Sequence, residues 1–385
     1  MLLHGQEHLG FKGGRLTPAY KGRGPTDRCT SYRSLLVSNH LGKALHRTIR
    51  EHHSQLFHRF LQLQQTGGRK HVPVQLAQHQ LRTFVRAAKR DCQSTGILYL
   101  DLTEAFYRVL REMPMGGEIP DHVVAHVASR MRLPQDSLHR LHAMLAQPCA
   151  LTQAGMPDSD RRAIQAIHTS THFWVQGQHD VSRTAMGTRP GDSMADWIFA
   201  FAWSTVLDKV ENFMRERHML QVLQAHEHLP LFGRVAVTDA TFPFIGPNWM
   251  DDLALCVQAA SPEQLVSDMG AVTGFLLDTC KEHCLTPNLA AGKTEVQLSF
   301  RGKNSRQYKK DFHGPNAAPT LMVLGEDEQH HIRIVRSYRH LGGIAHHTGE
   351  QATELTQKAA IGHLSPESTQ KDPFSEPTAA VEQTY

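Results

Sequence analysis

Several features that would place the chain in a common protein class are missing from its sequence. No apolar run approaches the roughly 18 residues of a bilayer-spanning helix, and residues 1–10 contain His, Gln and Glu where a secretion signal needs hydrophobic residues. The GxSxG motif of many hydrolases and the GxGxxG motif of dinucleotide-binding enzymes are also missing. We therefore expect a soluble intracellular chain with no membrane partner, and neither a hydrolase nor a dehydrogenase.

Cysteine is scarce, and histidine is plentiful without a metal-binding pattern. The six cysteines include no CxxC pair, so we expect reduced thiols and no disulfide framework. The sequence has 27 histidines, among them the HEH triplet at 226–228 and His283 between Cys280 and Cys284. None of them has the spacing of a known zinc motif, which predicts dispersed, solvated histidines.

What is present is an ordinary globular composition with an uneven charge distribution. Apolar residues make up 40% and charged residues 20% of the 385 positions, which excludes a wholly disordered, collagen-like or coiled-coil chain. Residues 1–95 hold 16 Lys and Arg against 4 Asp and Glu, a net charge of +12, and the rest of the chain carries −8. A basic surface beside an acidic one suits phosphate binding next to a carboxylate metal site, although a merely solvated basic face explains it equally well.

Periodicity predicts helices over 41–64 and 74–90, then an apolar strand over 96–100 that ends at Asp101, and further helices through Arg111 and over 123–145. A clear helix starts at Ser193, where Ser-Met-Ala-Asp fits a capping box. Beyond a Gly-Pro-Asn turn signal at 246–248, the apolar segment 249–257 contains Asp251 and Asp252, which predicts a tight hairpin with both carboxylates near its tip.

A helix over 262–284 and a strand over 294–300 complete an order of strand, helix, hairpin, helix and strand. This order indicates an α+β fold with a ferredoxin-like layer. After about residue 347 the chain is rich in Thr, Gln, Glu, Ser and Pro, and we expect the tail to be disordered.

The first indication of function is the presence of carboxylates inside apolar strands. An ionised group buried without a partner costs several kcal/mol, and a bound cation offsets that cost. Two strands side by side would bring Asp101 and Asp251 around a shared pair of Mg²⁺ ions, although carboxylates at strand ends are more often solvated. Mn²⁺ accepts the same oxygen ligands.

Six segments, in this order, resemble the motifs of reverse transcriptases, especially those of non-LTR (LINE-type) retrotransposons. LDLTEAF at 100–106 is similar to the first catalytic motif, GTRPGDS at 187–193 to the template- and nucleotide-positioning motif, and WMDD at 249–252 to the aromatic-x-Asp-Asp signature. YRSLL at 32–36 resembles the fingers motif, residues 288–295 the motif after the catalytic hairpin, and YRHLG at 338–342 the primer grip. The resemblance covers roughly residues 15–345.

The resemblance implies a polymerase right-hand fold with helical fingers and a ferredoxin-like palm. It implies a partial, basic, fingers-like region at 1–95, a palm at 96–345 and a polar disordered tail at 346–385, with the thumb largely missing. It also implies an RNA template, a DNA primer and dNTP as partners, with no obligate protein partner evident. As part of a retrotransposon the protein would act in the nucleus.

The resemblance assigns roles to individual residues. Asp101 and Asp251 would hold both metal ions, with Asp252 in support and the Leu102 carbonyl as a further ligand. The remaining roles are triphosphate binding by Lys21 and Arg33, exclusion of the ribose 2′-hydroxyl by Phe106, close nucleotide approach at Gly191, proton donation to pyrophosphate by Lys293, and the primer grip at Tyr338, Leu341 and Gly342.

Departures from the family pattern leave two alternatives open. Pro190 stands where many relatives have Gln, and Tyr107 stands where Asp is frequent. The endonuclease and Cys-rich segments usual for such polymerases are missing as well, which suggests a fragment or a decayed copy. The alternatives are a catalytically inactive nucleic-acid-binding fragment and an RNA-dependent RNA polymerase with a similar palm. A P-loop is rejected for Gly-Lys-Thr at 292–294, because Pro287 occupies the position of the required glycine.

Overall fold

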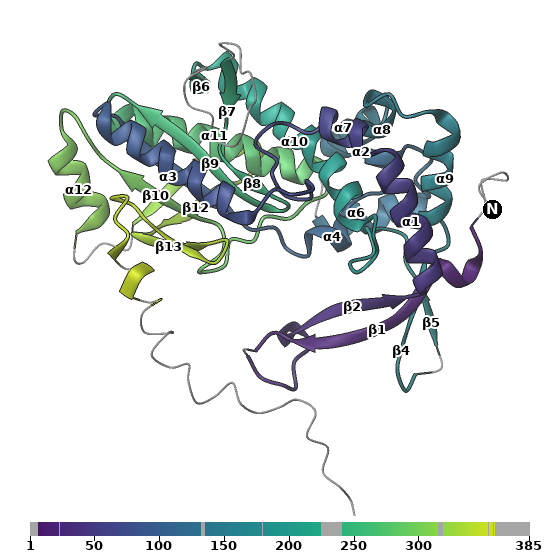
Figure 1. Cartoon of the computed structure of the whole chain (residues 1–385). Coiled ribbons are helices and arrows are strands. Elements are labelled where there is room, and N and C mark those ends of the chain that lie inside the picture. Colours follow the sequence, from purple (N-terminus) through teal and green to yellow (C-terminus); the bar gives the residue numbers. More distant parts are fainter. Residues whose placement is uncertain are drawn as a thin grey trace, which may run out of the picture.

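The computed structural model describes residues 7–22, 24–131, 135–178, 180–224, 241–314, 319–352, 354–356 and 358 (Figure 1). The HEH triplet at 226–228 and most of the tail predicted to be disordered lie outside these residues. No helix in the described part is long and apolar enough to cross a membrane. All six cysteines are free thiols, as predicted.

A six-stranded sheet forms the centre of the larger half of the molecule (Figure 1). Its strands, in spatial order, are β11 (Thr320–Leu324), β12 (Gln329–Ile334), β10 (Glu295–Ser299), β3 (Ser94–Leu100), β9 (Asp252–Ala259) and β8 (Asn248–Trp249). The central strand β3 is fully buried, with antiparallel neighbours on both sides. Strand β3 therefore fixes the positions of β9 and β10, which adjoin it.

Helices cover both faces of this sheet because successive side chains of a strand point to opposite sides. Leu98 and Leu100 pack into the core beneath α10 (Ala195–Glu216) and α11 (Pro262–Glu282). Ile97 and Tyr99 point the other way, toward α3 (Val74–Arg90). The helix predicted over 74–90 is thus confirmed, and it packs on the sheet together with residues far along the chain.

The predicted order of strand, helix, hairpin, helix and strand is present as β3, α10, β8–β9, α11 and β10. The spatial order β10-β3-β9-β8 sets the first and last strands of this unit side by side and leaves β3 and β9 at its centre. This is the arrangement of a split βαβ unit, and the mixed content confirms the predicted α+β class.

A second, smaller sheet extends below the first in Figure 1 and has the order β2-β1-β4-β5. It consists of β1 (Gly13–Tyr20), β2 (Tyr32–Ser38), β4 (His172–Val175) and β5 (Val181–Arg183). The expectation of a helical region at 1–95 was therefore incomplete, since it missed β1 and β2. Tyr20, Leu35 and Val37 remain exposed on this hairpin, so burial imposes little of the alternation that reveals a strand.

Several predicted helices are interrupted. The helix expected over 41–64 divides at His53 into α1 (His40–His52) and α2 (Ser54–Phe60), and the segment through Arg111 forms only the short α4 (Ala105–Arg108) before α5 (Glu112–Met115). The pattern over 123–145 is divided between two helices. The remaining elements are η2 (Leu9–Phe11), η3 (Cys29–Ser31), α6 (Asp121–Met131), α7 (Gln135–Leu145), α8 (Ala150–Gln153), α9 (Asp158–His168), β6 (Gln221–Gln224), β7 (Thr241–Phe244), α12 (Ser305–His313), β13 (Ser337–His340) and β14 (Gly343–His346).

The predicted capping box at Ser193 is wrong. Helix α10 begins at Ala195, and the carboxylate of Asp192 accepts a hydrogen bond of 2.9 Å from the Met194 backbone N–H. The Ser193 hydroxyl instead donates to the Lys43 carbonyl. The Asp192 carboxylate therefore closes a turn just before the helix, and the His46 ring that orients it comes from a distant part of the chain, which local sequence cannot reveal.

A buried arginine organises the chain between β4 and α10. The Arg111 guanidinium donates to the carbonyls of Gly187, His168, Thr184 and Met186 and to two threonine hydroxyls, at 2.6–3.2 Å. Burial lowers the pKa of Arg111 to about 10, so the group remains charged at neutral pH. A single cation thus satisfies the polar groups of a loop that has little secondary structure of its own.

Replacing Arg111 with Met keeps much of the volume and removes every donor. We expect Arg111→Met to lower the free energy of unfolding by at least about 3 kcal/mol, because several buried acceptors lose their partner at once. Urea unfolding measures this loss. Arg47→Met is the control, since Arg47 is exposed on α1. A loss equal to that of the control would contradict the role assigned to Arg111.

Candidate functional site

Strand pairing brings the predicted carboxylates to one end of the large sheet. In the antiparallel ladder of β3 and β9, Leu100 pairs with Leu253. Asp101 follows Leu100 and Asp252 precedes Leu253, so the same register sets these two aspartates opposite each other. Asp251 is the preceding residue, at the tip of the hairpin. The three carboxylates therefore meet at the end of the two central strands.

The β8–β9 hairpin is as tight as predicted. Trp249 pairs with Asp252, which leaves two residues in the turn, and Met250 adopts a left-handed φ of 58°. The Asn248 amide spans the turn and donates to the carbonyls of Met250 and Asp252. A side chain at Gly67 would lie 2.4 Å from the Met250 nitrogen, so the Gly67–Gly68 turn packs directly against the tip.

Asp101 has three close partners from the segment before β10. Lys293 Nζ lies 3.0 Å from Oδ1, and the Asn288 amide donates to Oδ2 at 2.9 Å. The Asp101 backbone N–H donates to the Thr294 hydroxyl. Both Asn288 and Thr294 belong to the motif-like segment 288–295, and the sequence gives neither a role of its own beyond a position just before a strand.

The clustering of negative charge raises the pKa values of two of the three aspartates. Burial raises the pKa of Asp251, and the nearby Asp101 charge raises it further. For Asp252, burial followed by the charges of Asp251 and Asp101 raises the pKa to about 6, although the side chain still reaches solvent. Lys293 opposes both shifts without cancelling them. The site therefore gains stability from any further cation that it can bind.

The donor atoms fit a hard divalent cation. Three carboxylates and the neighbouring backbone carbonyls are oxygen ligands, which Mg²⁺ and Mn²⁺ prefer, and no thiol or imidazole adjoins them among the described contacts. Leu102 is buried beside them and forms a bridge with Pro287. A role of its carbonyl as a metal ligand stays a prediction.

The loop at 187–192 lies against α4, which follows Asp101 in the chain. The Thr188 N–H donates to the Phe106 carbonyl at 2.7 Å, and the Phe106 ring packs on Phe199 with 4.7 Å between centroids. Gly191 has a φ of 103°, and a Cβ there would lie 2.7 Å from the Leu36 carbonyl oxygen. Glycine is thus required at 191 by both conformation and space.

A buried histidine holds this loop in place. His46 of α1 contacts Asp192 through Nδ1 at 2.7 Å and Glu7 through Nε2. Burial alone would lower the pKa of His46, but its hydrogen bonds to Asp192 and Glu7 outweigh burial and raise it. Burial would raise the pKa of Asp192, yet the hydrogen bond from His46 and the charge of Arg189 lower it to about 2. Both shifts favour the ionic form of the His46–Asp192 pair.

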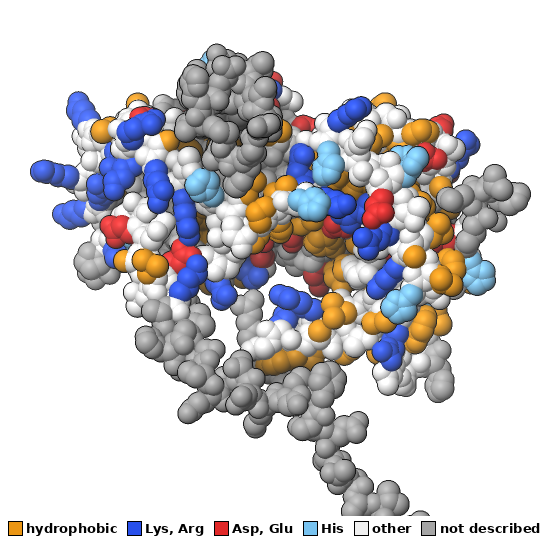
Figure 2. All heavy atoms as spheres, viewed as in Figure 1, with side chains coloured by type: hydrophobic (Ala, Val, Ile, Leu, Met, Phe, Trp, Pro, Cys, Tyr) orange, Lys and Arg blue, Asp and Glu red, His pale blue; other side chains and the backbone are white. Residues whose placement is uncertain are grey.

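The β1–β2 hairpin carries the predicted triphosphate-binding residues. Arg33 lies exposed on β2, and Lys21 lies exposed just beyond β1. Neither has a described contact with the three aspartates. Figure 2 shows that this face is hollowed between the hairpin and the body of the molecule, with acidic side chains at the back of the hollow. Tyr107 connects the two sides, because its hydroxyl donates to the Ser34 carbonyl.

The predicted primer grip forms a hairpin beside the carboxylates. Leu341 and Gly342 both have positive φ and make the two-residue turn between β13 and β14. The Tyr338 ring stacks on Tyr99 at 4.1 Å, and its hydroxyl donates to the Lys293 carbonyl. Burial, followed by the charges of Asp101 and Asp252, raises the pKa of Tyr338, which places the hairpin next to the acidic site.

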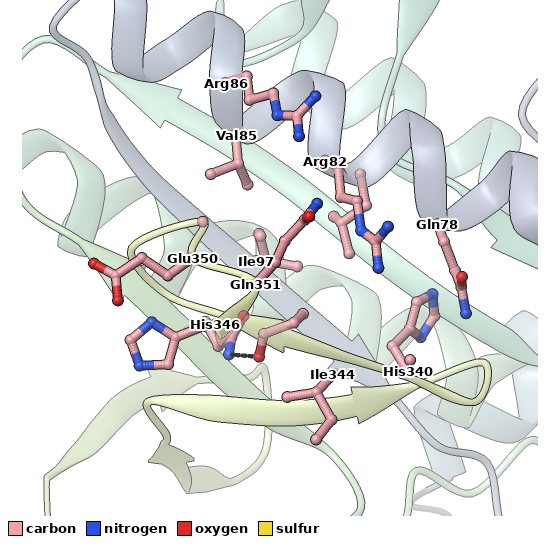
Figure 3. Close-up of a pocket in the computed structure, with 15 residues that line it drawn as sticks. Gln78, Arg82, Val85, Arg86, Ile97, His340, Ile344, His346, Glu350 and Gln351 are labelled. Atoms are coloured by element: carbon pink, nitrogen blue, oxygen red, sulfur yellow. Dashed lines mark hydrogen bonds between the residues drawn. The ribbon is translucent and has the colours of Figure 1, made fainter. Parts of the chain in front are cut away.

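On its side away from the carboxylates, the β13–β14 hairpin packs against α3, and a pocket lies between the hairpin and the helix. Figure 3 shows Arg82 and Arg86 reaching from the helix over this pocket, with Ile97 behind and His346 on the hairpin side. The Gln78 amide donates to the Leu341 carbonyl and fastens the turn to the helix. The contacts of this pocket support the hairpin and involve none of the three aspartates.

The pH dependence of folding offers a direct test of the carboxylate cluster. Asp252 has a folded-state pKa of about 6, above its ordinary value of 3.8, so it destabilises the metal-free fold increasingly as pH rises between these values. We expect Asp252→Asn to be more stable than the parent at pH 8, by about 1 kcal/mol after solvent screening, with the difference vanishing near pH 4.

Urea unfolding in EDTA at both pH values measures this difference. Asp311→Asn, which removes an exposed carboxylate of α12, is the matched control and should show no such gain at pH 8. If Asp252→Asn were the less stable protein at pH 8, the three carboxylates would not repel one another as described.

No protein-family model matches the chain, and no curated protein matches it. Among solved structures, it is similar to apo telomerase from Candida tropicalis truncated from the C-terminal domain, at 13% sequence identity and a TM-score of 0.41. The alignment covers 76% of this chain and 51% of the telomerase chain, so this chain spans about half the length of that protein. Similarity at this level leaves the function to be argued from the site itself.

Proposed function

We propose that the chain is the polymerase part of a reverse transcriptase of the non-LTR type, which copies an RNA template into DNA by nucleotidyl transfer to a primer 3′-hydroxyl. The observation that carries the proposal is the convergence of Asp101, Asp251 and Asp252 at the end of β3 and the β8–β9 hairpin. In this proposal the large sheet with its helices is the palm, and the β1–β2 hairpin with α1 and α2 belongs to the fingers.

Each part of the site has a role in this reaction. Asp101 and Asp251 would hold two Mg²⁺ ions and Asp252 would add negative charge. When bound, the metal ions would activate the attacking hydroxyl and neutralise charge on the leaving pyrophosphate. Lys293, whose Nζ lies 3.0 Å from Asp101 Oδ1, would donate a proton to that pyrophosphate.

The substrates would occupy the hollow between hairpin and sheet. Arg33 and Lys21 on its outer side would bind the triphosphate. The Leu36 carbonyl fills the space beside Gly191, so packing within the protein explains this glycine and gives it no role toward the nucleotide. Phe106 would exclude a ribose 2′-hydroxyl, and Tyr338 with the Leu341–Gly342 turn would position the primer end. Positioning supplies much of the catalysis in phosphoryl transfer, which agrees with a site built from several rigid contacts.

The first test is extension of a DNA primer on an RNA template with dNTPs and Mg²⁺. We expect the parent chain to extend the primer, and Asp101→Asn and Asp251→Asn to reduce the rate at least about 100-fold, because each removes a carboxylate that would hold the metal ions. Asp311→Asn, on the exposed face of α12, should keep the parental rate. Extension by Asp251→Asn at the parental rate would refute the mechanism, and salt-sensitive binding without extension by the parent would favour a non-catalytic nucleic-acid-binding protein.

A second test concerns the sugar. Replacing Phe106 with Ala removes the ring that would clash with a 2′-hydroxyl, so we expect the variant to incorporate ribonucleotides at least about tenfold better relative to deoxynucleotides. Paired extension assays with rNTPs and dNTPs measure the ratio. Tyr107→Phe keeps a ring at the adjacent position and should leave the ratio unchanged. A parent chain that already preferred rNTPs would point to an RNA-dependent RNA polymerase.

A further inference from the structure

The joint between α1 and α2 brings two histidines close to a carboxylate from a distant part of the chain. His52 ends α1, and His53 lies between the two helices, where it ends one and precedes the other. Asp160 lies in the first turn of α9, more than 100 residues later. Figure 1 shows α1 and α9 close together at the side of the molecule away from β10–β12. Although α1 and α2 belong to the proposed fingers, none of these three side chains has a role in the proposed polymerisation.

Their geometry is that of a nearly assembled metal site. His53 Nε2 lies 3.2 Å from Asp160 Oδ2, and the His52 and His53 rings meet edge to face with 4.8 Å between centroids. One ligand atom from each of the three residues lies within 4.8 Å of the other two. Tetrahedral Zn²⁺ with bonds of about 2.0–2.1 Å places neighbouring ligands about 3.3 Å apart. A small rotation of the exposed His52 ring would close the remaining gap.

A hydrogen bond between His53 and Asp160 accounts for only two of the three residues. The His52 ring has no hydrogen-bond partner in the described part of the chain and is exposed, yet it lies over the same carboxylate and imidazole. His53 is buried and its Nε2 faces the Asp160 carboxylate, so this ring is already oriented as a ligand. Two imidazoles with one carboxylate form a ligand set that suits zinc better than magnesium.

We propose that His52, His53 and Asp160 bind one zinc ion, which fastens the joint between α1 and α2 to α9. A water molecule would complete the tetrahedron, as in sites with three protein ligands. The same α1 helix carries His46, which contacts Asp192, and Arg50, whose guanidinium pairs with Asp196 in the first turn of α10. Zinc would therefore stabilise the helix against which the loop at 187–192 is held.

The test uses the full chain, stripped with EDTA and then supplied with zinc alone. We expect one tight equivalent of zinc per chain by competition with a chromophoric chelator, and a higher Tm on zinc addition, because a ligand that binds the folded state stabilises it. The same concentration of Mg²⁺ should give no such shift through this site. With Co²⁺ in place of zinc, visible absorption should report tetrahedral coordination.

His52→Gln is the decisive variant because His52 is exposed and has no described hydrogen-bond partner. Its Tm without metal should equal that of the parent, while its zinc affinity falls at least tenfold and the zinc-induced rise in Tm disappears. Asp160→Asn should lose zinc to a similar extent. His79→Gln, an exposed histidine on α3, is the matched control for the many other histidines and should keep both the tight equivalent and the shift.

Two results would overturn the zinc site. One is a His52→Gln or Asp160→Asn variant that binds zinc as tightly as the parent, and the other is tight binding by the parent with no rise in Tm. Primer extension in Mg²⁺ should be the same for His52→Gln and the parent. Failure of the zinc site therefore leaves the proposed polymerase untouched, and failure of primer extension leaves the zinc measurement valid.

Discussion

The pairing of β3 with β9 is the constraint on which the candidate site depends. Its antiparallel register sets Asp101 opposite Asp252, and the two-residue turn before β9 adds Asp251. A shift of the register by one residue would turn the apolar side chains of β3 to the wrong faces, so the buried core on both sides of the sheet fixes the register. Hydrophobic packing thus holds three like charges close together, in an arrangement that their own electrostatics oppose.

The fold offsets that repulsion only in part. Lys293 and Asn288 satisfy Asp101, while Asp251 and Asp252 keep raised pKa values. A purely structural cluster would gain stability by losing one of these carboxylates, because like charges at short range disfavour ionisation. An unbalanced acidic site at the end of a rigid sheet is suited to binding cations, which the proposed nucleotidyl transfer requires.

The loop before α10, which lies beside the site, is held by buried charged groups that are hydrogen-bonded within the protein, unlike the carboxylate cluster. The Arg111 guanidinium donates hydrogen bonds to carbonyls of the loop before α10 and to the His168 carbonyl at the end of α9. The His46–Asp192 pair holds the next residues of that loop against α1. Both sets are well satisfied by hydrogen bonds, as buried polar groups must be to avoid destabilising the fold. Arg111 and the His46–Asp192 pair therefore stabilise the loop beside the site. The negative charge of the three aspartates, in contrast, is only partly balanced within the protein.

Sequence alone determined the parts of this protein in which local pattern and tertiary environment agree. The helix at 74–90, the acidic hairpin and the order of elements around β3 followed from periodicity and turn residues, because each of these segments buries one regular apolar face. Only the tertiary structure decided the rest. The β1–β2 hairpin leaves several apolar residues exposed, and the turn that Asp192 closes before α10 depends on the buried His46. The Asn288 contact with Asp101 and the proximity of His52 to Asp160 join residues more than 100 positions apart. Such contacts follow from the packing of whole elements and leave no periodic trace in the sequence.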